Sequence, residues 1–228
     1  MHHIRPYQLF TQIEGGDRDN TVRIPMPKRR GTGGLSLLET FSLVAAAKLV
    51  DAQRIFEIGT YLGTTTLNLA LNVGEDSEIL TLDLDEEQAT SANQHPGDSE
   101  LTRTHLGSQN TLDFLDSPVS RRVKTLTGDS KKFDFSPWRA CVDLVFIDGG
   151  HDFATVKSDT ENAFELIRTD SRSCILWHDY RNPEYRDLTY YLEELSQHLE
   201  IFHIEDTMLC AWFNNVSLGI SSGMLKAA

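Results

Sequence analysis

Residues 54–72 read RIFEIGTYLGTTTLNLALN, and they say more about the architecture than any other stretch. A buried strand, a glycine turn and the start of a helix follow one another here without a gap. Glu57 lies at the end of the strand, and Gly59 and Gly63 let the backbone come close to a bound molecule. Thr64 is placed to cap the helix, whose positive dipole end suits a carboxylate or phosphate. The stretch predicts a ligand site on the turn.

Short apolar runs and helical patterns alternate along the rest of the chain, which is typical of a parallel sheet with helices on both faces. Residues 205–207 are too few for a crossover helix, so the last two strands must be antiparallel. We predict an α/β fold: a doubly wound, seven-stranded, mostly parallel sheet with a C-terminal antiparallel strand pair. Strands are expected near 54–59, 78–84, 122–127, 142–148, 173–178, 200–204 and 208–213. Helical stripes occupy 37–49, 153–167 and 185–199, with Asn182 and Pro183 as cap and first turn of the last.

The length of 228 residues favours one compact domain. Residues 1–34 are rich in Pro, Gly and charge without periodicity, which is typical of an N-terminal arm or lid. The alternating pattern fills residues 35–214. Residues 215–228 are predicted to be a C-terminal tail without chemistry.

The charge balance bounds the partners of this protein. Lys and Arg total 21 against 34 Asp and Glu, a formal charge of -13, which disfavours nucleic acid and acidic membranes. The chain shows no apolar run long enough to span a bilayer and no signal-peptide pattern after Met1. We therefore expect small-molecule partners, no nucleic acid, no membrane and a cytoplasmic location.

Polar residues follow nearly every predicted strand, at the edge where open α/β sheets bind ligands. Asp83 follows Gly59 by 24 residues, close to the roughly 20-residue spacing at which an acid meets a ribose hydroxyl. The turn lacks the third glycine of dinucleotide sites, so a nucleoside bearing a carboxylate is the better fit. Helix capping or loop solvation is the alternative for Asp83, Asp85 and Asp129.

These features together resemble the class I S-adenosylmethionine-dependent methyltransferases over residues 35–214, the methyltransferase domain. The shared features are the acid and glycine pair of EIGTYLG at 57–63, an acid after the second strand, GDS at 128–130 and the terminal strand pair. The resemblance implies S-adenosylmethionine as cofactor, with the methionine part on the glycine turn, the ribose at Asp83 and the adenine beside Asp129 and Ser130. The cofactor-binding set it predicts is Glu57, Gly59, Thr60, Gly63, Thr64, Asp83, Asp129, Ser130 and Asp148.

Two further segments are VFIDGGHDF at 145–153 and ILWHDY at 175–180. They resemble metal-dependent small-molecule O-methyltransferases of the catechol and macrocin types, and the broader methyltransferase family that carries a DGGH segment. That resemblance implies a divalent metal, Mg or Mn, held by Asp148, His178 and Asp179. It also implies that His151 accepts the proton of the substrate. Such a metal lowers the pKa of a hydroxyl and fixes it against the methyl donor.

His178 departs from the Asp or Glu of many relatives, and a nitrogen ligand moves the preference from Mg toward Mn, Fe, Co or Zn. A buried histidine bonded to backbone is the alternative for His178. The alternative for the run from Gly149 to His151 is a tight turn in which Asp152 caps the next helix. Glu57 has the alternative of a structural acid.

The predicted function is methyl transfer from S-adenosylmethionine to a hydroxyl oxygen of a small molecule. A nicotinamide-dependent oxidoreductase is the first alternative, disfavoured by the missing third glycine. A non-catalytic nucleoside-binding regulatory module is the second. Relatives often pair or form tetramers, so a homo-oligomer is compatible with the resemblance.

Overall fold

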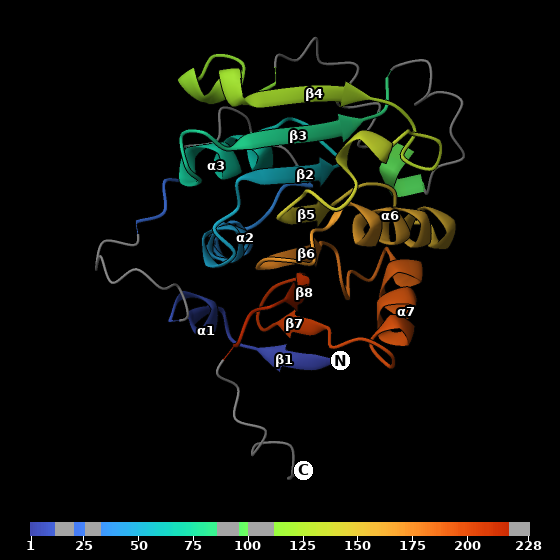
Figure 1. Cartoon of the computed structure of the whole chain (residues 1–228). Coiled ribbons are helices and arrows are strands. Elements are labelled where there is room, and N and C mark those ends of the chain that lie inside the picture. Colours follow the sequence, from blue (N-terminus) through green and yellow to red (C-terminus); the bar gives the residue numbers. More distant parts are fainter. Residues whose placement is uncertain (12–20, 26–32, 86–95, 100–111, 219–228) are drawn as a thin grey trace.

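The computed structural model describes residues 1–11, 21–25, 33–85, 96–99 and 112–218, and its centre is a single mixed sheet (Figure 1). The described residues form eight strands in the order β1-β7-β8-β6-β5-β2-β3-β4. All neighbours are parallel except β8, which is antiparallel to β6 and to β7. The strands are β1 (His2–Ile4), β2 (Arg54–Ile58), β3 (Glu78–Asp83), β4 (Val123–Thr127), β5 (Leu144–Ile147), β6 (Ser173–Trp177), β7 (Phe202–Ile204) and β8 (Cys210–Asn214).

The predicted strand count of seven is wrong, because β1 adds an eighth strand at the edge of the sheet. His2–Ile4 pairs in parallel with Phe202–Ile204 of β7. Three residues are too few to show an alternating pattern, and their partner lies near the other end of the chain. The first residues of the predicted arm therefore form the edge strand of the sheet. Residues 12–20 and 26–32 of the arm lie outside the described residues.

The seven strands that the sequence predicts are all present, each within two residues of its expected bounds. The antiparallel pairing of β7 with β8 is confirmed. β5 and β6 lie at the middle of the sheet and are buried along their whole length. Their apolar runs give no alternation, as expected for parallel strands covered on both faces.

Helices cover both faces of the sheet, so the doubly wound arrangement is confirmed. In Figure 1, α1, α2 and α3 lie on one side of the strands, and α6 and α7 on the other. None of the helices in the described part of the chain combines the length and apolar character needed to cross a membrane. The helices are α1 (Pro6–Phe10), α2 (Leu37–Leu49), α3 (Thr64–Asn72), α6 (Phe153–Leu166) and α7 (Arg186–Leu195), with short 3-10 turns η1 (Pro118–Arg122) and η2 (Ser136–Trp138).

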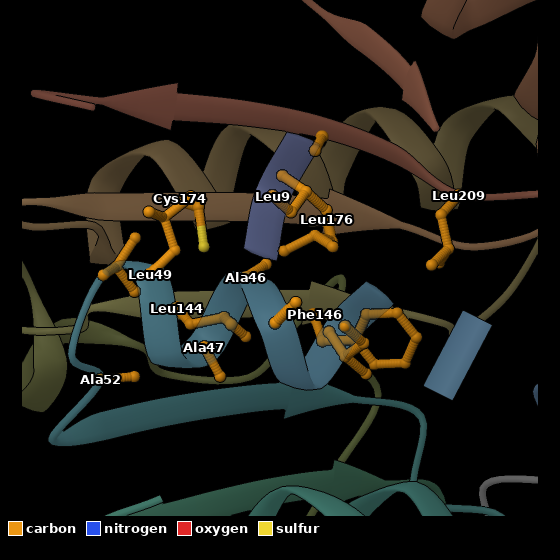
Figure 2. Packing of buried hydrophobic residues seen from close by; sticks show 14 of the residues in the cluster. Leu9, Ala46, Ala47, Leu49, Ala52, Leu144, Phe146, Cys174, Leu176 and Leu209 are labelled. Carbon is orange, nitrogen blue, oxygen red and sulfur yellow. The ribbon is translucent and has the colours of Figure 1, made fainter. Parts of the chain in front are cut away.

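The alternation of side chains along the central strands divides the core into two clusters. Leu144 and Phe146 of β5 pack on the α2 side, and Val145 and Ile147 pack on the α6 side. Figure 2 shows the first cluster, where the small Ala46 and Ala47 bring α2 close to the sheet. Each large apolar side chain buried in this way contributes about 1.5–3 kcal/mol. The sheet is therefore a rigid support for the residues beyond its strand ends.

Two predicted helix starts are wrong. Helix α3 takes Gly63 as its N-cap, at φ +73°, and Thr64 is the first helical residue. Helix α7 begins at Arg186 after Tyr185, so Asn182 and Pro183 lie in the preceding turn. The Thr64 side chain donates a hydrogen bond to Asp113 instead, and the Asn182 side chain donates one to Asp179.

The predicted tail is described as far as Leu218. The Asn215 side chain donates hydrogen bonds to the carbonyl oxygens of Thr169 and Ser171, and Leu218 is buried in the core. The beginning of the tail therefore packs on the domain.

Candidate active site

The turn after β2 lies against the end of β5. Gly59 has φ +100°, and its N–H donates to the carbonyl oxygen of Leu82 at 2.9 Å. A Cβ atom at Gly59 would stand 2.0 Å from the carbonyl oxygen of Asp148. Only glycine allows this approach, which brings the predicted cofactor turn beside the predicted metal ligand.

The second glycine of the turn is covered by a later part of the chain. A Cβ atom at Gly63 would stand 2.8 Å from the ring of Phe114. The hydroxyl of Thr64 donates to Asp113 Oδ2 at 2.6 Å, and the Asp113 N–H donates to the carbonyl oxygen of Leu62. A carboxylate therefore already faces the positive end of α3, which stabilises the helix start.

Asp83 ends β3 and holds the first part of the turn. Its Oδ2 accepts hydrogen bonds from the N–H groups of Thr60 and Tyr61 at 3.1 and 2.8 Å. The hydroxyl of Thr60 lies 2.6 Å from that of Thr81 on the same strand. Asp83 remains only partly buried, so the acid predicted to bind the ribose is also the acid that shapes the turn.

Glu57 lies behind the turn and is fully buried. Its Oε2 accepts hydrogen bonds from the hydroxyls of Thr66 on α3 and of Thr81 on β3. Burial raises the pKa of Glu57 to about 8, although the two hydroxyls act in the opposite direction. The carboxyl group therefore joins the strand, the helix and the neighbouring strand from inside.

Asp129 and Ser130 follow β4, and both are partly buried. Asp129 Oδ1 accepts a hydrogen bond from the Lys131 N–H at 3.1 Å, and the carboxylate pairs with the ammonium groups of Lys131 and Lys132 at 3.8 and 3.5 Å. Like Asp83, these residues stand at the edge of the sheet where parallel strands end. The structure thus brings the predicted cofactor residues to one rim.

The predicted metal ligands converge beyond β5 and β6. Asp148, His178 and Asp179 each offer a ligand atom, and these atoms lie within 4.8 Å of one another. His178 Nδ1 is 3.1 Å from Asp148 Oδ1 and 3.3 Å from Asp179 Oδ2. Asp179 has φ +62°, and its Oδ1 accepts a hydrogen bond from the Asn182 side chain at 2.7 Å. The loop after β6 therefore turns Asp179 back toward the strand ends.

The other nitrogen of His178 faces Glu39 of α2, with Nε2 3.6 Å from Glu39 Oε2. Burial disfavours the charged imidazole, but Asp148, Asp179 and Glu39 outweigh it and raise the pKa of His178 above its ordinary value. Burial also opposes ionisation of Glu39, yet the facing His178 and the hydrogen bonds from the Met208 and Ser36 N–H groups lower its pKa to about 2. Carboxylates, and not backbone groups, surround this histidine.

His151 stands between two carboxylates in the same cluster. Its Nδ1 is 2.7 Å from Asp98 Oδ1, and its Nε2 is 3.0 Å from Asp179 Oδ2. The backbone N–H of His151 donates to Asp98 Oδ2. The ring stacks on Tyr185 at a centroid distance of 3.8 Å. Burial lowers the pKa of His151, but the bonds to Asp179 and Asp98 overcome this effect and raise it to about 10. Asp152 caps α6 next to it, as expected.

Residues 56–180 match a protein family described as a methyltransferase domain. The match covers more than half of the 228 residues. The chain belongs to this methyltransferase family. Membership decides against the nicotinamide-dependent oxidoreductase that the turn also allowed.

Solved methyltransferase structures share the fold of this methyltransferase. The O-methyltransferase TomG from Streptomyces achromogenes, in complex with S-adenosylmethionine, is 16% identical with a TM-score of 0.54, over 80% of this chain and 82% of that one. A putative O-methyltransferase from Klebsiella pneumoniae is 19% identical with a TM-score of 0.54, over 91% of this chain and 90% of that one. The O-methyltransferase from Bacillus cereus, in complex with S-adenosylhomocysteine, is 16% identical with a TM-score of 0.53, over 79% and 83%. No curated protein matches the chain.

Sequence reasoning missed three residues of the methyltransferase site. Ser36 and Glu39 have the spacing of a capping box, which predicts the start of a helix. That pattern gives no indication that Glu39 contacts His178. Asp98 belongs to a helical turn at residues 96–99 without periodicity. Tyr185 was assigned only to a helical stripe.

Replacing Gly59 tests the contact between the turn and β5. Because the carbonyl oxygen of Asp148 is fixed in the sheet, Gly59→Ala is expected to lower the free energy of unfolding by more than about 3 kcal/mol. Urea denaturation followed by tryptophan fluorescence measures it. Gly34→Ala is the matched control, since a Cβ atom there meets nothing within 4 Å and should change stability by less than about 0.5 kcal/mol. Equal effects of the two substitutions would contradict the contact.

Glu57 gives the methyltransferase a pH dependence of known sign. Its pKa is raised from 4.5 to about 8 in the folded state, so its contribution to stability is complete below pH 4.5 and is lost as pH rises toward 8. The loss amounts to about 1.4 kcal/mol per pH unit in that window. Denaturation at pH 6 and pH 8 should therefore show wild type losing about 2 kcal/mol relative to Glu57→Gln. A difference between the two proteins that stays constant with pH would show that Glu57 is already ionised.

Proposed function

We propose that this protein transfers a methyl group from S-adenosylmethionine to a hydroxyl oxygen of a small molecule, assisted by a divalent cation. Family membership supports methyl transfer, and the O-methyltransferases that share the fold support an oxygen acceptor and this donor. One observation carries the proposal. Asp148, His178, Asp179 and His151 meet beyond β5 and β6, directly beside the glycine turn.

The donor fits the rim formed by the first four parallel strands of the methyltransferase domain. The turn has a glycine at each end, Gly59 and Gly63, and the partly exposed Asp83 offers a carboxylate to ribose hydroxyls. Asp129 and Ser130 stand at the end of β4, where an adenine ring would extend from that ribose. Thr60, Thr64 and Glu57 support the turn from behind. In this arrangement the transferred methyl group would lie close to Asp148, whose carbonyl oxygen is packed against Gly59.

The donor atoms at the second part of the site fit a divalent cation. Two carboxylates and one imidazole converge, and a mixed oxygen and nitrogen set suits Mn, Fe, Co or Zn better than Mg. When bound, such an ion supplies positive charge that lowers the pKa of a hydroxyl and neutralises Asp148 and Asp179. Asp148 and Asp179 would hold it together with His178.

His151 is the proton acceptor in this proposal. Asp98 fixes the ring through Nδ1 and through the backbone N–H, so Nε2 is the nitrogen directed at Asp179 and the acceptor side. Asp179 is one of the two acids that raise the pKa of His151. A cation that engages Asp179 would remove that part of the shift, so that Nε2 would lose its proton and could take the hydroxyl proton. In the overall reaction an oxygen–carbon bond forms, the carbon–sulfur bond breaks with its electron pair left on sulfur, and the proton goes to His151.

A direct assay tests the function. Purified protein is incubated with methyl-labelled S-adenosylmethionine and a panel of catechols, sugars and other hydroxylated metabolites, with and without a chelator. We expect label in at least one acceptor, loss of transfer with chelator, and recovery with Mn²⁺ or Co²⁺. A rate of methyl transfer that is unchanged by the chelator would remove the metal from the proposal. Binding of S-adenosylhomocysteine without transfer to any acceptor would favour the non-catalytic module.

His151 is tested by substitution. His151→Ala is expected to lower kcat by about 10²–10⁴-fold, the usual contribution of a general base, while the Kd for S-adenosylhomocysteine stays within about twofold, since the donor rests on other residues. Steady-state kinetics and calorimetry give the two quantities. The matched control is His198→Ala, which changes an exposed histidine after α7. Unchanged kcat in the first variant would exclude His151 as the base.

A further inference from the structure

Glu39 combines two roles that are usually separate. It is the third residue of α2 and forms a capping box with Ser36, whose N–H donates to Glu39 Oε2 at 2.7 Å. Acids in capping boxes usually lie at the surface, but this side chain is only 7% exposed. Its Oε1 accepts a hydrogen bond from the Met208 N–H at 2.8 Å, in the turn between β7 and β8. Two elements from opposite ends of the chain therefore hold this carboxylate in one orientation.

The carboxylate held in this way points at His178. Its Oε2 stands 3.6 Å from His178 Nε2, while His178 Nδ1 faces Asp148 and Asp179 at 3.1 and 3.3 Å. The two ring nitrogens thus face different acids on opposite sides. Nδ1 is on the side of the converging ligand atoms, and Nε2 is on the side of α2. Capping explains the bond to Ser36, but not the burial of Glu39 against the imidazole.

We propose that Glu39 is the positioning residue of the metal site: its carboxylate faces the Nε2–H of His178 and attracts it, so that Nδ1 is left as the nitrogen that binds the cation. The inference rests on the proposed function and deepens it. A histidine ligand presents one nitrogen to its metal, and a carboxylate on the other nitrogen fixes the ring and makes the ligating nitrogen more basic. A neutral imidazole brings no negative charge to the site. Glu39 supplies that charge from directly behind it.

Metal binding measured without turnover tests the proposal. Wild-type protein, Glu39→Ala, Glu39→Gln and Ser36→Ala are titrated with Mn²⁺, with the free ion followed by electron paramagnetic resonance, and with Co²⁺, followed by its visible absorption. Glu39→Ala is expected to bind Mn²⁺ about 10–100-fold more weakly, the usual effect of losing the carboxylate behind a histidine ligand. Glu39→Gln keeps the shape and one acceptor oxygen, so a smaller loss is expected. The Co²⁺ spectrum of Glu39→Ala should also change.

Ser36→Ala is the matched control, because it breaks the same capping box and leaves the Glu39 carboxylate in place. Its thermal midpoint should fall by roughly 2–4 °C with Mn²⁺ affinity unchanged. Each variant is also titrated with S-adenosylhomocysteine, which reports on the folded cofactor site. Equal metal affinity in wild type and Glu39→Ala, or an equal loss in Ser36→Ala, would overturn the proposal and leave the proposed function standing.

A double-mutant cycle with His178→Asp shows whether Glu39 acts through the imidazole. In that background Glu39→Ala should no longer weaken Mn²⁺ binding, because no ring remains to be positioned. An undiminished loss would overturn the proposal. Wild-type protein that binds S-adenosylhomocysteine but neither Mn²⁺ nor Co²⁺ would remove the metal from the proposed function, and this role of Glu39 with it.

Discussion

The close approach of Gly59 to the main chain of Asp148 is the constraint on which the site depends. β2 and β5 are neighbours in the sheet, with Ile58 paired to Ile147, and the chain must turn away immediately after each of them. A side chain at Gly59 would occupy the space of the Asp148 carbonyl group. Its absence lets the turn that suits the donor and the acid that suits the cation lie against each other. Methyl transfer needs this proximity, since the reacting groups must be in contact before any chemistry.

Electrostatics determine how the rest of the site is arranged around that contact. Burying charges is unfavourable unless they are paired. Each imidazole here lies between acids from different elements, so α2, the turn at residues 96–99 and the loops after β5 and β6 are tied together by charge. Two imidazolium groups do not balance four carboxylates, which leaves a net negative site suited to a cation. The carboxylates are those of Glu39, Asp98, Asp148 and Asp179, and the imidazoles are those of His151 and His178.

The sequence predicts the sheet well because each central strand is a short apolar run followed at once by a polar residue. Asp83, Asp148 and His178 were found in that way. The edge strand His2–Ile4 could not be predicted, because three residues are too few to show a hydrophobic pattern and its partner strand lies near the other end of the chain. The roles of Glu39 and Asp98 could not be predicted for a related reason. Their partners, His178 and His151, lie 139 and 53 residues away in sequence, and no local periodicity encodes such contacts. Thr64 and Asn182 have good capping chemistry, but other hydrogen bonds take precedence: Thr64 donates to Asp113, 49 residues away, and Asn182 donates to Asp179 in its own loop.

The need for directional hydrogen bonds between distant elements explains why so many ionisable groups lie inside a small domain. Glu57, Glu39 and His178 are all buried, and apolar residues of equal volume would often stabilise such positions. Each of the three instead joins separate elements. Glu57 joins β2, α3 and β3, Glu39 joins α2 to the β7–β8 turn, and His178 lies between Glu39 of α2 and Asp148 after β5. Apolar packing is non-directional, whereas these hydrogen bonds fix orientation. The sheet therefore supplies stability, and the buried acids fix the orientation that a reaction between two bound molecules requires.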